Sequence, residues 1–290
     1  MKKIKILIPN YNDWKSVFKL LENIDLEISD WDAEVSILII NDASTEKMPE
    51  NNFNFKNIKS TKIVNMKENR GHQRSTAAGL KYISEKEDFD YVIPMDGDGE
   101  DRPEELNLLF SKMNKYPDKV ITANRVKRSE GLIFRFCYVI HKYLTFFFTG
   151  NVIKFGNYTC LPKIVVNNMV KDASTWSSFS GTLVKICKDR FSISSIRGTR
   201  YFGPSKMSYF SLIKHSLSIN AVFKKTVIIR SIIFLLVYFF FIYQSLSVIT
   251  IIPIIFVFLM IYSVIFLSRR ENLNEFNLSL NNIESIENLS

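Results

Sequence analysis

Two patterns of apolar residues divide the chain. Over the first 125 residues or so, short unbroken apolar runs alternate with segments whose apolar residues recur at helical spacing. The runs that predict buried strands are residues 3–9, 33–42, 61–66, 90–96 and 119–125, and the segments that predict helices are residues 14–24, 75–86 and 103–116. Strands that alternate with helices of this length are typical of an α/β fold, in which a mostly parallel sheet carries helices on both faces.

The second pattern is an almost continuous apolar stretch near the C-terminal end. At about forty residues it has twice the length that one helix needs to cross a membrane, so two crossings fit better, at residues 226–243 and 248–267 with a polar turn at 244–247. Basic residues at 224–225 and 269–270 flank the stretch, and the positive-inside rule then places both ends in the cytoplasm. The alternative, two buried helices of a soluble domain, would normally show a polar face, which this stretch almost lacks.

These patterns predict three parts: a cytoplasmic α/β domain at residues 1–215, a membrane hairpin at 216–270 and a polar tail at 271–290. Within the first part, residues 131–148 form an amphipathic segment rich in Phe and Tyr, which we expect to lie in the membrane interface. The tail is rich in Asn and Glu, with Leu and Ile at loosely helical spacing. We expect it to form either a weak amphipathic helix or a disordered end.

Composition narrows the classes of function. The net charge is +9, but Lys and Arg are spread through the chain rather than striped with aromatic residues, so no nucleic-acid partner is expected. An anionic membrane surface or a phosphate-bearing substrate accounts for the charge as well. Cys137, Cys160 and Cys187 lack the spacing of a disulfide framework or a zinc site, and the first residues are too polar for a signal peptide. We therefore expect reduced cysteines and a cytoplasmic location for the bulk of the chain.

Acidic and amide residues gather where three predicted strands end. Residues 9–13, 41–42 and 96–98 each follow such an end, and ligands of parallel sheets bind off that edge. Asp96 and Asp98 are separated by one glycine, and carboxylates so close are tolerable when they share a proton or bind a divalent cation. Such oxygen ligands suit Mg²⁺ or Mn²⁺ together with substrate phosphates, although a solvated acidic loop is the alternative. Because GxxxxGK[ST] and GxGxxG loops are absent, metal and basic side chains would have to hold a pyrophosphate.

Six motifs, in this order, resemble the family 2 glycosyltransferases of the GT-A fold, and within them the polyprenyl-phosphate glycosyltransferases, which include dolichol-phosphate mannose synthase and the bactoprenol glucosyltransferases. The motifs are ILIPNYND, IINDAST, NRGHQRSTAAGL, MDGDGEDRPEEL, NRVKR and RGTRYFGPSKMSYFSL. With the hairpin, the resemblance covers about residues 3–268. The fourth motif is the most specific, because it is similar to the subfamily pattern M-D-A-D-L-Q-D-P-P-E. Asp13, Asn41, Ala43 and Glu100 depart from the residues usual at their positions.

The resemblance implies roles for the residues at matching positions. The nucleotide pocket would be lined by Pro9, Tyr11, Asp13 and Asp42, with Asp42 accepting a hydrogen bond from the base. The donor pyrophosphate would be bound by Asp96, Gly97, Asp98, Arg125, Arg200 and Lys206, the metal by Asp96, Asp98 and Glu100, and the acceptor phosphate by Arg128 and Arg135. Of these, Asp96, Asp98, Arg125 and Arg128 are the predicted catalytic residues.

The resemblance further implies an inverting enzyme of the hexosyltransferase type. It would move a sugar from a UDP- or GDP-sugar to a polyprenyl phosphate, such as undecaprenyl phosphate, in the synthesis of cell envelope polysaccharide. The enzyme would be a multi-pass protein of the inner membrane with a cytoplasmic catalytic domain at 1–215. A lipid phosphate is already anionic at neutral pH, so it needs no general base.

Two other functions remain open from the sequence, and homo-oligomerisation is open as well. A glycosyltransferase with a hydroxyl acceptor, a glycolipid or glycan, would need a carboxylate base, for which Asp172 is a candidate. A catalytically inactive, membrane-anchored nucleotide-binding or scaffold protein is suggested by the departures at Asn41 and Ala43. Outside the site, we interpret His72 as a structural or helix-capping residue and Trp176 as a packing residue.

Overall fold

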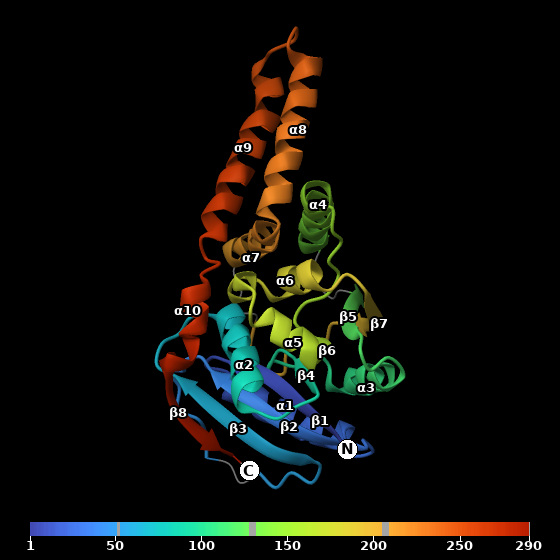
Figure 1. Ribbon diagram of the computed structural model, residues 1–290, viewed down its shortest axis with the longest axis vertical. Coiled ribbons are helices and arrows are strands. Elements are labelled where there is room, and N and C mark those ends of the chain that lie inside the picture. Colours follow the sequence, from blue (N-terminus) through green and yellow to red (C-terminus); the bar gives the residue numbers. More distant parts are fainter. Residues whose placement is uncertain (51–52, 128–131, 205–208, 290) are drawn as a thin grey trace.

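The computed structural model describes residues 1–50, 53–127, 132–204 and 209–289 (Figure 1). The strands are β1 (Lys2–Asn10), β2 (Ala33–Asn41), β3 (Ile58–Met66), β4 (Tyr91–Pro94), β5 (Val120–Lys127), β6 (Thr159–Pro162), β7 (Arg190–Ile196) and β8 (Ile283–Asn288). The α-helices are α1 (Trp14–Glu27), α2 (His72–Lys86), α3 (Leu106–Lys115), α4 (Leu132–Thr149), α5 (Lys163–Met169), α6 (Phe179–Ile186), α7 (Tyr209–Val222), α8 (Lys224–Ile242), α9 (Val248–Ser268) and α10 (Leu273–Asn277). Short 3₁₀ turns are η1 (Pro103–Glu105), η2 (Ala173–Trp176) and η3 (Ser279–Asn282).

The strands form one mixed sheet in the order β7-β5-β6-β4-β1-β2-β3-β8. Strands β4, β1, β2 and β3 run parallel, as do β5 and β7, whereas β6 and β8 pair antiparallel with their neighbours. The register sets Asn10 opposite Asn41 and Asn41 opposite Asn65, so three strands end level with one another. The predicted mostly parallel α/β sheet is confirmed, and the level ends create the edge at which a ligand of such a fold binds.

Helices cover both faces of the sheet, which explains the unbroken apolar runs in the sequence. Ile6 and Ile8 of β1 pack with α1 and α3 on one face, and Leu7 between them packs with α2, α5 and α6 on the other. A parallel strand buried on both sides has no polar face to display, so its sequence cannot alternate. Figure 1 shows α2 lying across the nearer face.

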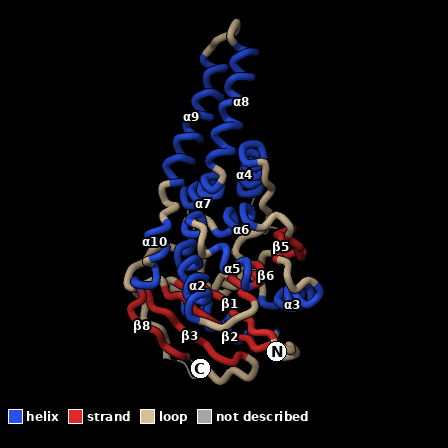
Figure 2. The backbone as a smooth tube through the Cα atoms, viewed as in Figure 1, coloured by secondary structure: helices blue, strands red, loops and turns tan. Residues whose placement is uncertain are grey.

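The two apolar helices α8 and α9 form a hairpin that extends away from the sheet (Figures 1 and 2). Both are long and apolar enough to cross a membrane by length and composition. The two helices pack through a narrow seam that includes Val227 and Val264, while Phe241 stays 75% exposed. Helices α4 and α7 lie at the base of the hairpin, and Arg230 of α8 donates a hydrogen bond to the carbonyl of Phe147 at the end of α4 (3.0 Å).

The tail contains a short helix, as one of its two expectations has it, and also a strand that neither expectation included. Helix α10 is short but real, and the residues after it form β8, which pairs antiparallel with β3. The expected disordered end is therefore wrong, and the tail is part of the sheet rather than an appendage. The open edge of β3 offers a row of unpaired backbone groups, which β8 satisfies even though its own side chains are mostly exposed.

Candidate active site

The end of β2 is tied to the loop that precedes α2. Asp42 is buried, and its two carboxylate oxygens accept hydrogen bonds from the backbone N–H groups of Arg70 (3.0 Å) and Gly71 (2.8 Å). Gly71 has a φ of +88°, a left-handed conformation that favours glycine. The predicted base contact Asp42 thus also fixes the start of α2, and each oxygen keeps a second lone pair for a ligand.

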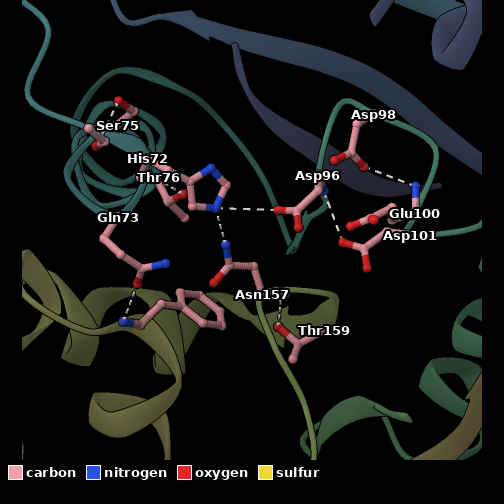
Figure 3. Close-up of polar contacts among 12 residues, drawn as sticks. His72, Gln73, Ser75, Thr76, Asp96, Asp98, Glu100, Asp101, Asn157 and Thr159 are labelled. Carbon is pink, nitrogen blue, oxygen red and sulfur yellow. Dashed lines mark hydrogen bonds and ion pairs between the residues drawn. The ribbon is translucent and has the colours of Figure 1, made fainter. Parts of the chain in front are cut away.

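The acidic stretch after β4 forms a compact turn closed by its own side chains. Asp98 accepts a hydrogen bond from the N–H of Glu100, and Asp101 accepts one from the N–H of Asp96, each at 2.9 Å (Figure 3). Glycine lets the turn between the two predicted ligands pack closely on α1, because a Cβ on Gly97 would lie 2.9 Å from Cγ2 of Val17, and one of the two would have to shift. The turn is therefore packed tightly against the first helix.

His72 faces Asp96 across the site, which the sequence analysis did not foresee. Its Nε2 lies 3.3 Å from Oδ1 of Asp96 and 2.6 Å from Nδ2 of Asn157, from the loop before β6 (Figure 3). A protonated Nε2 faces the carboxylate, and an unprotonated one accepts from the amide. The capping role predicted for His72 is wrong, because Gly71 occupies the N-cap position of α2. The contact between His72 and Asp96 is visible only in the structure, because the two residues belong to separate sequence motifs.

Arginines from distant parts of the chain reach the same acids. Arg200 pairs with Asp98 and, through Nη2, with Asp13 after β1 (2.7 Å). Nη2 of Arg125 lies 3.4 Å from Oδ1 of Asp101. The structure thus brings together five of the residues predicted for the site or adjacent to it in sequence. Because each ion pair joins segments that the sequence separates, the pairs hold the strand ends in one arrangement.

The charges shift the pKa values of the acids in opposite directions. Burial, and then the neighbouring charge of Asp96, raise the pKa of Asp98 to about 6 and that of Asp101 to about 7. Burial also acts to raise the pKa of Asp96, but His72 and then Arg125 outweigh it and hold that pKa well below its usual range. For His72, burial lowers the pKa, yet the charge and hydrogen bond of Asp96 reverse the effect and raise it. The cluster is short of positive charge at Asp98 and Asp101.

The fit to a divalent cation rests on two carboxylates rather than three. Glu100 pairs with Arg197, and in the described part of the chain no three acidic, His or Cys side chains have the arrangement of a metal site. The predicted trio of Asp96, Asp98 and Glu100 is therefore not assembled. Oδ1 of Asp96 is buried and lies 3.3 Å from Nε2 of His72, and the pKa of Asp98 is raised partly by Asp96. Both features fit a cation that completes its coordination with substrate phosphates.

The structure describes some of the other predicted site residues but not all of them. Pro9 is buried near the end of β1, and Tyr11, which follows that strand, is partly exposed. Arg128 and Lys206 lie outside the described residues, and so does the side chain of Arg135, although its backbone belongs to α4.

An open pocket of about 480 Å³, lined by Asn41 and Ala43 among others, lies between the ends of β2 and β3 and the tail strand β8. Asn41 donates a hydrogen bond to Asn65 (2.8 Å), and Asn65 donates one to Glu287 of β8 (2.6 Å). These polar contacts extend the site along the edge of the sheet. No motif in the sequence indicates this pocket, because one of its walls comes from the tail.

Comparisons with known proteins agree with this geometry. Residues 5–162 match the family model described as glycosyl transferase family 2. Among solved structures, the chain is similar to glucosyl-3-phosphoglycerate synthase from Mycobacterium tuberculosis in complex with Mn²⁺, UDP and glucosyl-3-phosphoglycerate, with a TM-score of 0.54 and 11% identity over 78% of this chain and 80% of that one. Its complex with Mn²⁺, UDP-glucose and phosphoglyceric acid gives 0.55 and 12% over the same shares. A complex with Mg²⁺ and UDP gives 0.52 and 11%, over 78% and 79%. At such identities the likeness shows the fold.

Proposed function

Because the chain belongs to glycosyl transferase family 2, we propose that this glycosyltransferase moves a sugar from a UDP- or GDP-sugar to the phosphate of a polyprenyl lipid. One observation carries the proposal. Acids and arginines pair at the strand ends, where they could bind a cation and a diphosphate. An apolar hairpin extends from the same domain (Figure 1). A site for a nucleoside diphosphate and an anchor in lipid are together what such a transfer requires.

The donor half of the reaction uses the acids and bases at the strand ends. Asp96 and Asp98 would hold Mg²⁺ or Mn²⁺, which supplies charge neutralisation to the departing nucleoside diphosphate. Arg200, which pairs with Asp98 and Asp13, would turn a guanidinium N–H toward a phosphate oxygen of the donor. Arg125 and Lys206 are proposed to add further charge. The fold's appearance with UDP-glucose and Mn²⁺ in the mycobacterial enzyme supports this assignment.

The acceptor half of the reaction is proposed to lie at the membrane surface. Helix α4 presents Tyr143, Phe146 and Phe147 to solvent at the base of the hairpin, and aromatic residues favour the interface between lipid and water. Arg128 and Arg135 are proposed to bind the lipid phosphate. The hairpin at 216–270 then anchors the catalytic domain to the cytoplasmic face of the inner membrane.

The phosphate acceptor is favoured over a hydroxyl acceptor by the state of Asp172, the candidate general base. Its carboxylate accepts a hydrogen bond from the N–H of Ser174 (3.0 Å) and pairs with Lys185 (2.8 Å). Burial acts to raise the pKa of Asp172, but the hydrogen bonds from Lys185 and Ser174 outweigh it and hold the pKa below its usual value. A carboxylate so engaged is a poor proton acceptor.

The test supplies the full-length protein in lipid nanodiscs with radiolabelled UDP- and GDP-sugars, Mn²⁺ or Mg²⁺, and undecaprenyl phosphate. We expect an organic-soluble product that mild acid hydrolyses, with inverted configuration at the anomeric carbon. Asp172→Asn is the matched control and should keep this activity. Transfer to a hydroxyl-bearing glycolipid but not to the lipid phosphate, together with loss of activity in Asp172→Asn, would overturn the proposed acceptor.

A further inference from the structure

The tail returns from the hairpin directly to the donor site. Only four residues, 269–272, separate the end of α9 from α10, which lies beside the first part of α2 (Figure 1). Phe276 of α10 is fully buried, and its ring stacks on Trp176 with the centroids 5.4 Å apart. This aromatic contact holds α10 in place and so determines the position of Glu275, the residue before Phe276.

That neighbour, Glu275, holds two arginines at once. Its Oε1 lies 2.7 Å from Nη1 of Arg70 and 3.1 Å from Nη1 of Arg74, and Oε2 accepts from Nη2 of Arg74 (3.3 Å). The guanidinium of Arg74 also lies 5.1 Å from the Trp176 ring, and the side chain of Asn272 caps Glu275's own N–H (3.0 Å). All three charged side chains are largely shielded from water, which strengthens the pairing relative to an exposed ion pair.

Arg70 and Arg74 lie on either side of the point where the loop before α2 joins the helix, and the donor site depends on this loop. Arg70 and Gly71 donate the N–H groups that bind Asp42, and His72 faces Asp96. Arg74 follows one half-turn later in α2. The loop is thus held from the sheet side by Asp42 and from the opposite side by Glu275. A site for a diphosphate loses much of its binding when its parts move by about 1 Å.

We propose that Glu275 is a positioning residue for the donor, through which the tail completes the nucleotide site. The inference rests on the proposed function in one respect, that the donor is a nucleoside diphosphate sugar. The tail also reaches the ends of β2 and β3, because Glu284, Ser285 and Glu287 of β8 line the pocket that Asn41 and Ala43 share.

The experiment compares Glu275→Gln with Asn277→Ala in the full-length protein. Asn277 lies on the same helix and accepts a weak hydrogen bond from Lys81 (3.4 Å), away from the loop. Three quantities are measured: the Kd of UDP and of GDP with Mn²⁺, the donor KM and kcat, and hydrogen exchange of the peptides that cover residues 68–74. For Glu275→Gln we expect Kd and KM to rise about 10-fold, with faster exchange in the loop and kcat changed much less. Asn277→Ala should match the wild type.

Rescue and coupling separate positioning from general destabilisation. Glu275→Asp keeps the charge with a shorter reach and should recover part of the nucleotide affinity. Arg70→Gln combined with Glu275→Gln should lose clearly less affinity than the sum of the two single losses, because the pair acts as a unit, and a fully additive loss would count against the inference. Unchanged loop exchange in Glu275→Gln, or an equal loss in Asn277→Ala, would overturn the inference. If the wild type binds neither UDP nor GDP, the proposed function fails, and loop exchange still decides the role of Glu275.

Discussion

The strand-end site and the hairpin satisfy their side chains in opposite ways. At the strand ends, charged groups find partners inside the protein: Arg200 joins Asp13 to Asp98, and Arg125 lies beside Asp101. In the hairpin, large apolar side chains such as Phe241 and Leu236 remain 75% and 68% exposed. Water tolerates scattered exposed apolar residues but not a continuous sleeve of them. The first region therefore pairs its charges within the protein but stays short of positive charge at Asp98 and Asp101, whereas the second exposes a surface that is apolar enough to cross a membrane.

The largest effect is expected from Asp98→Asn, which breaks the strand-end half of this comparison. It removes a carboxylate proposed to hold the cation and the partner of Arg200, while the amide still accepts the N–H of Glu100. Transferase activity should fall about 10³-fold, because a charge is lost where the leaving diphosphate is stabilised. The readout is initial rate with UDP- or GDP-sugar at saturating Mn²⁺. As a control, Glu100→Gln should keep most activity, because Glu100 pairs with Arg197. Wild-type rates in Asp98→Asn would refute the assignment of Asp98 to the cation site.

The second region, the hairpin, is tested by replacing an exposed leucine with aspartate in two separate variants, one in the hairpin and one on the sheet domain. Leu236→Asp places a charge in the middle of α8, where a bilayer penalises it by about 3 kcal/mol. Leu108 of α3 is 50% exposed on the sheet domain, so Leu108→Asp should cost little. We expect Leu236→Asp to reduce the membrane-bound fraction after carbonate extraction and Leu108→Asp to leave it unchanged. Equal extraction of the two variants would show that the hairpin does not lie in lipid.

A smaller effect is expected from Gly97→Ala, which sharpens how the acidic turn is held. The new methyl group would lie 2.9 Å from Cγ2 of Val17, so the turn must shift or α1 must yield. Such overpacking costs about 1–3 kcal/mol, visible as a lower Tm and weaker Mn²⁺-dependent nucleotide binding. Val17→Ala added to Gly97→Ala makes room and should restore part of both. If Gly97→Ala alone matched the wild type, the tight packing of the turn against α1 would be disproved.

The fold was predictable from sequence because its signals are local, while parts of the site were not because their signals are spatial. Unbroken apolar runs between helical segments revealed β1 and β2, and the strand ends then located Asp42 and Asp96. For His72 only the capping half of the interpretation is contradicted, and nothing near it in the sequence shows that its ring meets Asp96.

The tail was misread for a related reason. Strand β8 has little apolar periodicity of its own, and it forms because β3 offers an open edge to pair with. The pairing of Glu100 with Arg197 is likewise a contact between segments about a hundred residues apart, so the acid looked available as a metal ligand in the sequence.

The smallest expected effect is on stability as a function of pH, and it measures how much charge the strand-end site lacks. Asp98 and Asp101 have pKa values of about 6 and 7, above the ordinary value of 3.8, so the folded protein binds more protons than the unfolded chain between about pH 4 and 7. The free energy of unfolding should therefore fall as pH rises through this window. His72, whose pKa is raised, acts in the same direction above its ordinary value of 6.5, whereas the stabilisation from Asp96 is lost only below about pH 4.

In the presence of a chelator, this predicts a decline in Tm of about 2–4 °C across the window. Asp101→Asn removes one of the two raised groups and should flatten the decline, and Mn²⁺ with UDP should flatten it further by supplying the missing positive charge. The exposed pair of Lys19 and Glu22 on α1 provides the control, because Glu22→Gln removes a carboxylate that water already screens and should leave the slope unchanged. A Tm that rises from pH 4 to 7 without divalent cation would contradict this prediction. It would mean that the protein itself already neutralises the acids at the strand ends, so that the site has no need of a cation.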